Sequence, residues 1–212
     1  MNDIEDQSIQ QFLDALASKA STPGGGGAAA LMGAQAAALV SMVCHLTLGK
    51  ANYAAVQDDM QALLQRAESL RAELTAMMQA DVTVFNQVMA AYGLAKTTDA
   101  EKAVRSAQIQ HALRAATDVP LACAKACAEV VHLSRIAAEK GNSNVITDAG
   151  VAVMAAYAGL KSAALNVYIN AGSIKDREFA EQRLAELAAI LAGAEVASSV
   201  IYQAVQEKLS AA

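Results

Sequence analysis

The sequence predicts an all-α fold, a single-domain bundle of long helices around a buried, alanine-rich central helix. Apolar residues make up 55% of the 212 residues, whereas aromatic residues make up 4% and Trp is absent, so Ala, Leu, Val and Met supply most of the apolar surface. This composition favours closely packed helices. Only two prolines interrupt the chain, and no segment alternates apolar and polar residues with the period of two that marks a half-buried strand.

A short amphipathic helix is predicted over residues 8–19. Asp6 or Ser8 can cap its N-terminus, because both side chains accept a hydrogen bond from a free backbone amide. The apolar residues of this helix recur at core spacing: Ile9, Phe12, Leu13 and Leu16.

Four consecutive glycines, Gly24, Gly25, Gly26 and Gly27, precede a helix that is predicted to run to about Leu48. Because glycine has no Cβ, this segment can adopt positive φ and let a ligand approach its backbone closely. The free amides of the following helix and the positive end of its dipole favour an anion here. The segment is neither a P-loop nor a dinucleotide fingerprint, since it lacks the Gly-Lys-Ser/Thr of the first and the preceding strand of the second. A flexible linker is the alternative interpretation.

Residues 24–45 carry no charged side chain and are the one candidate in the sequence for a membrane span. Ala and Gly dominate this segment, and it contains few of the larger apolar residues that drive insertion. We therefore interpret it as the central helix of the bundle, and expect no membrane as a partner.

Five further helices are predicted beyond Gly49. They span residues 57–92, 98–118, 120–140, 147–172 and 176–212. Thr98 and Glu101 resemble a capping box at the start of the second. Pro120 suits the first turn of a separate third helix, because its missing N–H is not needed there.

Charge and cysteine content limit the classes of partner. The net charge of −5 argues against nucleic acid as the main partner. Three cysteines, an odd number with no signal peptide recognised, indicate a reducing environment and predict a cytoplasmic protein. The three histidines are isolated from one another in the sequence, so no metal site is predicted.

Asp81 interrupts the apolar stripe of the predicted helix 57–92. It lies four residues after Met77 and four before Phe85, on the side that should face the core. A carboxylate in this position is unfavourable unless it is paired or protonated. Two interpretations stay open: a salt bridge or cap to a neighbouring helix, and a general acid or base with a raised pKa.

A polar stripe marks the predicted helix 147–172. Ser162, Asn166 and Asn170 follow one another at four-residue steps and therefore share one face. Buried amides must be hydrogen-bonded, and either a neighbouring helix or a ligand rich in donors and acceptors could satisfy them.

Several motifs follow one another along the chain. They are Ser-Thr-Pro-Gly-Gly-Gly-Gly-Ala-Ala-Ala at 21–30, Leu-Thr-Leu-Gly-Lys at 46–50, Asp-Val-Thr-Val-Phe at 81–85, Met-Ala-Ala-Tyr-Gly-Leu-Ala-Lys at 89–96, Gly141-Asn142 with Asp148, and Asn-Val-Tyr-Ile-Asn at 166–170. In this order they resemble the cyclodeaminase/cyclohydrolase family of folate enzymes, which comprises the cyclodeaminase domain of formiminotransferase-cyclodeaminase and stand-alone bacterial methenyltetrahydrofolate cyclohydrolases. The likeness covers essentially the whole chain, so residues 1–212 are identified as one such domain. Ala95 is a departure, because the family usually has Pro there.

The resemblance implies a homodimer that binds a reduced folate near the subunit interface, with Asp81 as general acid/base and without a metal or bound cofactor. Apolar faces in excess of what one chain can cover also favour a two-fold dimer. The function it implies is hydrolysis of 5,10-methenyltetrahydrofolate to 10-formyltetrahydrofolate. Formiminotetrahydrofolate cyclodeaminase activity at the same site is one alternative. A folate-binding or interaction protein without turnover is the other.

Ten residues are expected to bind the substrate. They are Gly24, Gly25, Gly26, Gly27, Lys50, Lys96, Asn142, Asp148, Asn166 and Asn170. Within this set, the glycines and Lys50 suit the carboxylates of the folate tail, while Asn166 and Asn170 are candidates for holding the pterin or the developing oxygen.

Overall fold

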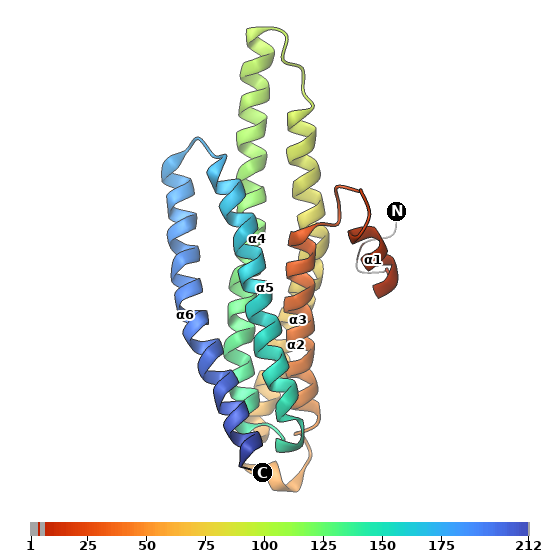
Figure 1. The fold of residues 1–212 in the computed structure, drawn as a ribbon, viewed down its shortest axis with the longest axis vertical. Coiled ribbons are helices and arrows are strands. Elements are labelled where there is room, and N and C mark those ends of the chain that lie inside the picture. The colour runs from red at the N-terminus through yellow and green to blue at the C-terminus, as the bar shows by residue number, and fades with distance from the viewer. Residues whose placement is uncertain (1–3, 5–6, 212) are drawn as a thin grey trace.

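The computed structural model is a bundle of long helices, and it describes residue 4 and residues 7–211 (Figure 1). Its elements are α1 (Ile9–Leu16), α2 (Gly25–His45), η2 (Ala51–Val56), α3 (Gln57–Tyr92), α4 (Asp99–Lys140), η3 (Ser143–Val145), α5 (Ile146–Gly172) and α6 (Arg177–Ser210). The two η elements are short 3₁₀ helices at the lower end of the bundle in Figure 1. The described part of the chain contains no strand, so the predicted all-α class is confirmed.

The alanine-rich helix α2 occupies the centre of the bundle, as predicted. It packs against α3, α4 and α5, and more than half of its residues are buried. Gly33 lets these helices approach closely, because the side chains of Leu74 and Cys127 leave no room for a Cβ there. One stripe of α2 faces outward and is exposed: Gln35, Ala38, Met42 and His45.

The helices α3 and α4 extend beyond the others and form an arm at the top of Figure 1. A small second cluster of buried apolar side chains supports the base of this arm, separate from the main core around α2. It joins α3 and α4 to the end of α5 and the start of α6: Ala91, Ile109, Ala112, Leu113, Ala171, Ile174 and Ala180. The arm is therefore anchored at its base, while its tip is exposed.

The predicted break at Pro120 is wrong, because α4 is one continuous helix of 42 residues with Pro120 inside it. The predicted capping box is present: the Thr98 side chain accepts from the Glu101 amide, and the Glu101 side chain accepts from the Thr98 amide. Tertiary packing overrides the local signal of the proline, since α4 packs against α2, α3, α5 and α6.

The first helix is shorter than predicted, and its apolar stripe is only partly used. Ser8 caps α1 through a capping box with Gln11, while Asp6 lies outside the described residues. Phe12 is buried, whereas Ile9 and Leu13 are 76% and 52% exposed. The expectation that all four apolar residues face the core is therefore wrong for Ile9 and Leu13.

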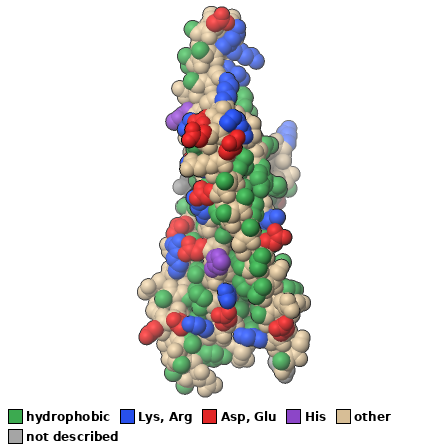
Figure 2. Space-filling view, turned by 90° about the vertical axis from the view of Figure 1, so that its left-hand side faces the viewer, with side chains coloured by type: hydrophobic (Ala, Val, Ile, Leu, Met, Phe, Trp, Pro, Cys, Tyr) green, Lys and Arg blue, Asp and Glu red, His purple; other side chains and the backbone are tan. Residues whose placement is uncertain are grey.

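Three helical segments are long and apolar enough to span a membrane by length and composition, where the sequence analysis expected one. They are Gly25–His45, Ser143–Gly172 and Arg177–Ser210, and the buried shares of their most apolar windows are 61%, 50% and 22%. The last two segments thus combine apolar composition with exposed faces. Figure 2, which looks onto the side of the bundle where α6 lies, shows a band of hydrophobic side chains along this surface.

Candidate active site

Asp81 lies on α3 against the first turn of α2. Its Oδ2 accepts a hydrogen bond from the Gly27 amide, with a donor–acceptor distance of 3.0 Å. This amide is one of the first N–H groups of a helix, which have no partner within the helix itself. The carboxylate thus satisfies one free donor of α2, and the positive end of the α2 dipole lies beside it.

The glycine segment begins the helix rather than forming a loop of positive φ. Gly24 is the N-cap of α2, and Gly25 is its first residue. Among the described glycines only Gly49 has a positive φ, of 75°, so residues 24–27 do not use the positive φ that glycine allows. Gly26 is required for another reason: a Cβ there would overlap the carboxylate of Asp81. The glycine is needed for the close approach of a side chain, not for an unusual backbone conformation.

A cleft of about 290 Å³ opens beside Asp81, between the start of α2, the middle of α3 and the upper half of α5. It is lined by Ser21, Thr22, Gly24, Gly25, Gly26, Asp81, Val84, Phe85, Val88, Ala116, Asn166 and Asn170. Six of the residues predicted from the sequence therefore meet here, from three different helices and the N-cap of α2. The described lining contains no Lys, Arg or His.

The two asparagines of α5 are held by hydrogen bonds to carbonyl groups. The Asn170 Nδ2 donates to the Ala116 carbonyl on α4 at 2.6 Å, and the Asn166 Nδ2 donates to the Ser162 carbonyl on its own helix at 3.1 Å. A carbonyl only accepts, so the NH₂ group of each amide must face it and the Oδ1 occupies the other position. In both side chains the Oδ1 is the acceptor that these bonds leave available, and both residues line the cleft together with Asp81.

Burial raises the pKa of Asp81 above its ordinary value, and the hydrogen bond from the Gly27 amide lowers it by a smaller amount. Desolvation acts in this direction because it disfavours the charged form of a carboxyl group. Of the predicted structural alternative, the cap to a neighbouring helix is present, since Asp81 accepts from the Gly27 amide of α2. The salt bridge does not apply, because no cation contributes to the shift and no Lys or Arg lines the cleft. An unpaired, half-buried carboxyl at the edge of a cleft can exchange protons with a bound molecule.

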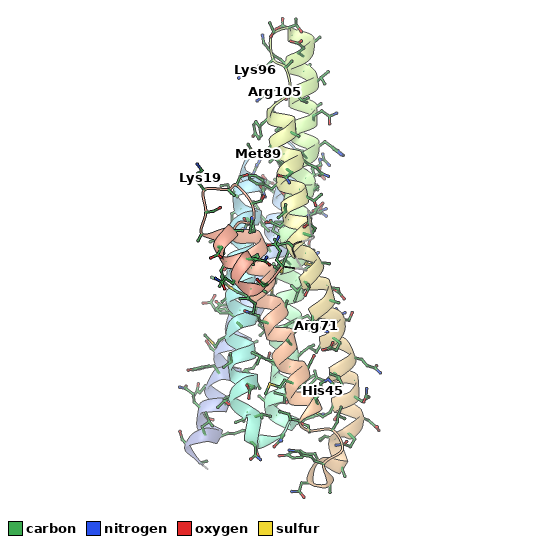
Figure 3. All side chains as sticks on the ribbon, turned by 90° about the vertical axis from the view of Figure 1, so that its right-hand side faces the viewer. Lys19, His45, Arg71, Met89, Lys96 and Arg105 are labelled. Carbon is green, nitrogen blue, oxygen red and sulfur yellow. The ribbon has the colours of Figure 1, made fainter. Side chains whose placement is uncertain are left out.

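Of the ten predicted binding residues, Gly27 contacts Asp81 through its amide but does not line the cleft, and four others lie away from it. Lys50 follows the C-terminal end of α2, and a helix of 21 residues is about 30 Å long, so Lys50 lies at the other end of the bundle. Asp148 lies in the first turn of α5, at that same lower end. Figure 3 shows Lys96 at the tip of the arm and His45, the last residue of α2, far below it. The order of these residues along the sequence did not show how far apart they lie along the long axis of the bundle.

Asn142, the fourth of these residues, joins the lower ends of α2 and α4. Its Nδ2 donates to the Leu46 carbonyl at 2.9 Å, and its backbone amide donates to the Thr47 Oγ1 at 2.9 Å. Its Oδ1 accepts from the Asn144 amide. These bonds satisfy its side chain internally and support the turn into α5.

We expect Asn142→Ala to lower the free energy of unfolding by about 1–3 kcal/mol, because it removes the hydrogen bonds of a buried side chain, among them the one to the part-buried Leu46 carbonyl. Denaturant unfolding measures this change. The Michaelis constant should stay near the wild-type value, since the cleft is at the other end of α2. A raised Michaelis constant with unchanged stability would return Asn142 to the substrate site.

Six residues of the cleft were not predicted from the sequence. Val84, Phe85 and Val88 lie one and two turns after Asp81 on α3, and this spacing could have identified them. Ser21 and Thr22 directly precede the glycines. Ala116 comes from α4 and carries no local signal, so only the packing of α4 against α5 reveals it.

A larger hollow of about 640 Å³ lies between α3 and α4 in the arm. Its lining is mostly apolar, with Gln87, Gln108 and His111 as its polar side chains, and it contains none of the predicted site residues. His111 is the titratable side chain in this lining, so the choice of the smaller cleft rests on Asp81 and on the predicted binding residues that meet there. Within the described chain, no three His, Cys, Asp or Glu side chains gather in a way that could hold a metal ion.

Comparison with known proteins supports the resemblance seen in the sequence. A family model described as Formiminotransferase-cyclodeaminase matches residues 8–189. The chain is 58% identical to a methenyltetrahydrofolate cyclohydrolase of Methylorubrum extorquens, over 96% of this chain and 98% of that protein. It is 30% identical to the formimidoyltransferase-cyclodeaminase of Rattus norvegicus over 92% of this chain, which spans 36% of that longer protein.

The fold is also that of a solved relative. The crystal structure of formiminotetrahydrofolate cyclodeaminase from Thermotoga maritima superposes with a TM-score of 0.82 at 30% identity, covering 98% of each chain. Fold and sequence thus agree over nearly the whole length. This chain belongs to the formiminotransferase-cyclodeaminase family.

Proposed function

We propose that this protein is a methenyltetrahydrofolate cyclohydrolase, which hydrolyses 5,10-methenyltetrahydrofolate to 10-formyltetrahydrofolate with Asp81 as general acid/base. The observation that carries the proposal is an unpaired carboxyl with a raised pKa, held at the start of α2 beside a cleft without cationic side chains. The 58% identity to the cyclohydrolase of Methylorubrum extorquens supports the choice of reaction.

The charge of the cleft suits this substrate. Methenyltetrahydrofolate carries an amidinium cation, in which one carbon bridges two nitrogens. The Asp81 carboxylate and the Oδ1 atoms of Asn166 and Asn170 favour a cation and N–H donors. At about 290 Å³ the cleft is at the lower limit of ligand pockets, which occupy about 300–1,000 Å³. It therefore takes the ring end of the folate, and the glutamate tail extends outside.

The reaction begins with addition of water to the amidinium carbon. The ionised Asp81 takes a proton from the water while the water oxygen bonds to the amidinium carbon. This gives a neutral tetrahedral adduct. One carbon–nitrogen bond then breaks, and the protonated Asp81 returns its proton to the departing nitrogen. The hydroxyl proton of the adduct leaves to solvent as the formyl C=O forms. General acid–base catalysis of this kind contributes about 10²–10⁴-fold in rate.

The free amides of α2 are placed to assist this step. Gly25 and Gly26 are in the first turn of the helix and line the cleft, and their N–H groups have no partner within the helix. We assign them to the oxygen that water contributes, which becomes the formyl oxygen. Donors held in place for a developing oxygen stabilise the transition state without reorganisation.

Cyclodeaminase activity is the second candidate, and the likeness to the Thermotoga maritima cyclodeaminase favours it. The same carboxyl could take the proton of N10 as this nitrogen attacks the formimino carbon, and give it to the amino nitrogen, which then leaves as ammonia. Incubating the purified protein with each folate separates the two reactions: the methenyl absorbance falls in the hydrolysis assay and rises in the deamination assay. We expect a fall above the uncatalysed rate. Binding of the folate with neither change would indicate a carrier or interaction protein.

The proposal also includes a homodimer, in the cytoplasm, that uses neither a metal nor a bound cofactor. All three cysteines are free thiols, which suits a reducing compartment. Large apolar side chains of α5 are exposed: Val151 at 56%, Met154 at 45%, Leu165 at 69% and Ile169 at 71%. Leu165 and Ile169 directly precede Asn166 and Asn170 of the cleft, so a dimer formed on this surface has its interface beside the active site.

We expect sedimentation to show a dimer at micromolar concentration, and Leu165→Glu to shift it toward the monomer, since a charge in an apolar interface is unfavourable. Val104→Glu is the matched control, because Val104 is 58% exposed on the arm and away from the apolar surface of α5. A fully active wild-type monomer at that concentration would contradict the dimer.

A further inference from the structure

Pro120 lies in the interior of α4, where a proline is rare. It is buried, and the helix extends from Asp99 to Lys140 around it. Proline has no N–H, so the hydrogen bond that residue 120 would donate to the Ala116 carbonyl in a regular helix cannot form. The Ala116 carbonyl is therefore available to a donor from outside α4.

Asn170 on α5 supplies that donor. Its Nδ2 lies 2.6 Å from the Ala116 oxygen, and both residues line the cleft beside Asp81. The bond connects two helices, whereas Asn166 is held only by a carbonyl of its own helix. We call this hydrogen bond the tether. Because the Ala116 carbonyl accepts but does not donate, the tether fixes which end of the Asn170 carboxamide faces the cleft.

We propose that Pro120 is a positioning residue for the substrate site. By removing one helical donor it frees the Ala116 carbonyl, and this carbonyl holds the Asn170 side chain with its Oδ1 toward the cleft. The inference rests on the proposed function, in which this oxygen accepts a hydrogen bond from an N–H group of the pterin ring. Pro120 itself does not line that cleft.

Pro120→Ala restores the N–H and lets residue 120 compete with Asn170 for the Ala116 carbonyl. A helix with an uninterrupted series of backbone hydrogen bonds is at least as stable as one that a proline interrupts. We therefore expect the melting temperature to stay level or rise. We expect the Michaelis constant for methenyltetrahydrofolate to rise about tenfold, the effect of one hydrogen bond, with kcat within about threefold of wild type. A contact of equal strength in ground and transition states acts on binding alone.

The double variant tests whether Pro120 acts through Asn170. Asn170→Ala alone should raise the Michaelis constant at least as much as Pro120→Ala does. Adding Pro120→Ala to Asn170→Ala should then cause no further rise, because the side chain to be positioned is gone. Ser134→Ala is the matched control: its hydroxyl bonds the Val130 carbonyl, lower on α4 and away from the cleft, so its kinetics should match wild type.

Wild-type kinetics in Pro120→Ala would overturn the inference. So would a double variant in which the two fold-increases in the Michaelis constant multiply. Failure of the proposed function has a different signature, which is absence of hydrolysis by the wild type itself. In that case amide NMR spectra still report the tether. The side-chain NH₂ signal of Asn170, identified by its loss in Asn170→Ala, should be protected from exchange in the wild type and lose that protection in Pro120→Ala. Equal protection in both proteins would refute the tether.

Discussion

Asp81→Asn is expected to lower kcat at least about a hundredfold while the folate still binds. The amide has nearly the same shape as the carboxyl, and its oxygen can still accept the hydrogen bond from the Gly27 amide. The Gly27 amide at the start of α2 therefore keeps its hydrogen-bond acceptor. The variant cannot take a proton from water or return one to the departing nitrogen, so the loss falls on the chemical step.

Steady-state hydrolysis and equilibrium binding of the folate, measured on the same preparation, separate these effects. Asp148→Asn is the matched control, because it makes the same change in the first turn of α5, outside the cleft. It should leave kcat within about twofold, as surface substitutions away from such sites have small effects. Near-wild-type turnover in folded Asp81→Asn would remove Asp81 from the chemistry.

Gly26→Ala should be almost as damaging as loss of the carboxyl. A Cβ at this position overlaps the Asp81 carboxylate, so the side chain must leave its place at the start of α2. A displacement of about 1 Å in a reacting group can reduce the rate about a hundredfold. Overpacking should also lower the free energy of unfolding by about 1–3 kcal/mol.

Gly25→Ala makes the same change one residue earlier, where no atom lies within 4 Å of the added carbon. Both variants keep the backbone N–H and replace a glycine in the first turn of α2, so they differ mainly in the contact with Asp81. We expect Gly25→Ala to lose less than about tenfold in kcat/KM and no stability. Equal losses in the two variants would show that the glycines are needed for flexibility and not for the position of the carboxyl.

The helices were largely predictable because their ends carry local signals. The predicted helix 57–92 matches α3, and Thr98, Gly172 and Asp176 lie at helix boundaries as expected. Pro120 misled the prediction, since a proline inside a helix and one that begins a helix look alike in sequence. Which one applies depends on the neighbouring helices and on the donor that Asn170 provides.

The candidate site was predictable where a residue violated the pattern of its own helix. Asp81 stood on an apolar stripe and Asn166 and Asn170 on a polar one, and the structure brings all three to one cleft. Lys50 and Lys96 were suggested by family motifs without a local anomaly, and they lie at opposite ends of the bundle. Their heights depend on how the helices are arranged in space, which no local pattern contains.

The dependence of kcat/KM on pH is the most direct measurement of the role of Asp81. Only the ionised carboxyl can take a proton from water, and burial raises its pKa, so the rate should rise with pH through a pKa above the ordinary value of about 3.9. After correction for the uncatalysed reaction, the wild type should show this acidic limb and Asp81→Asn should lack it. The same limb in both proteins would contradict the assignment of Asp81 as the group that performs the reaction.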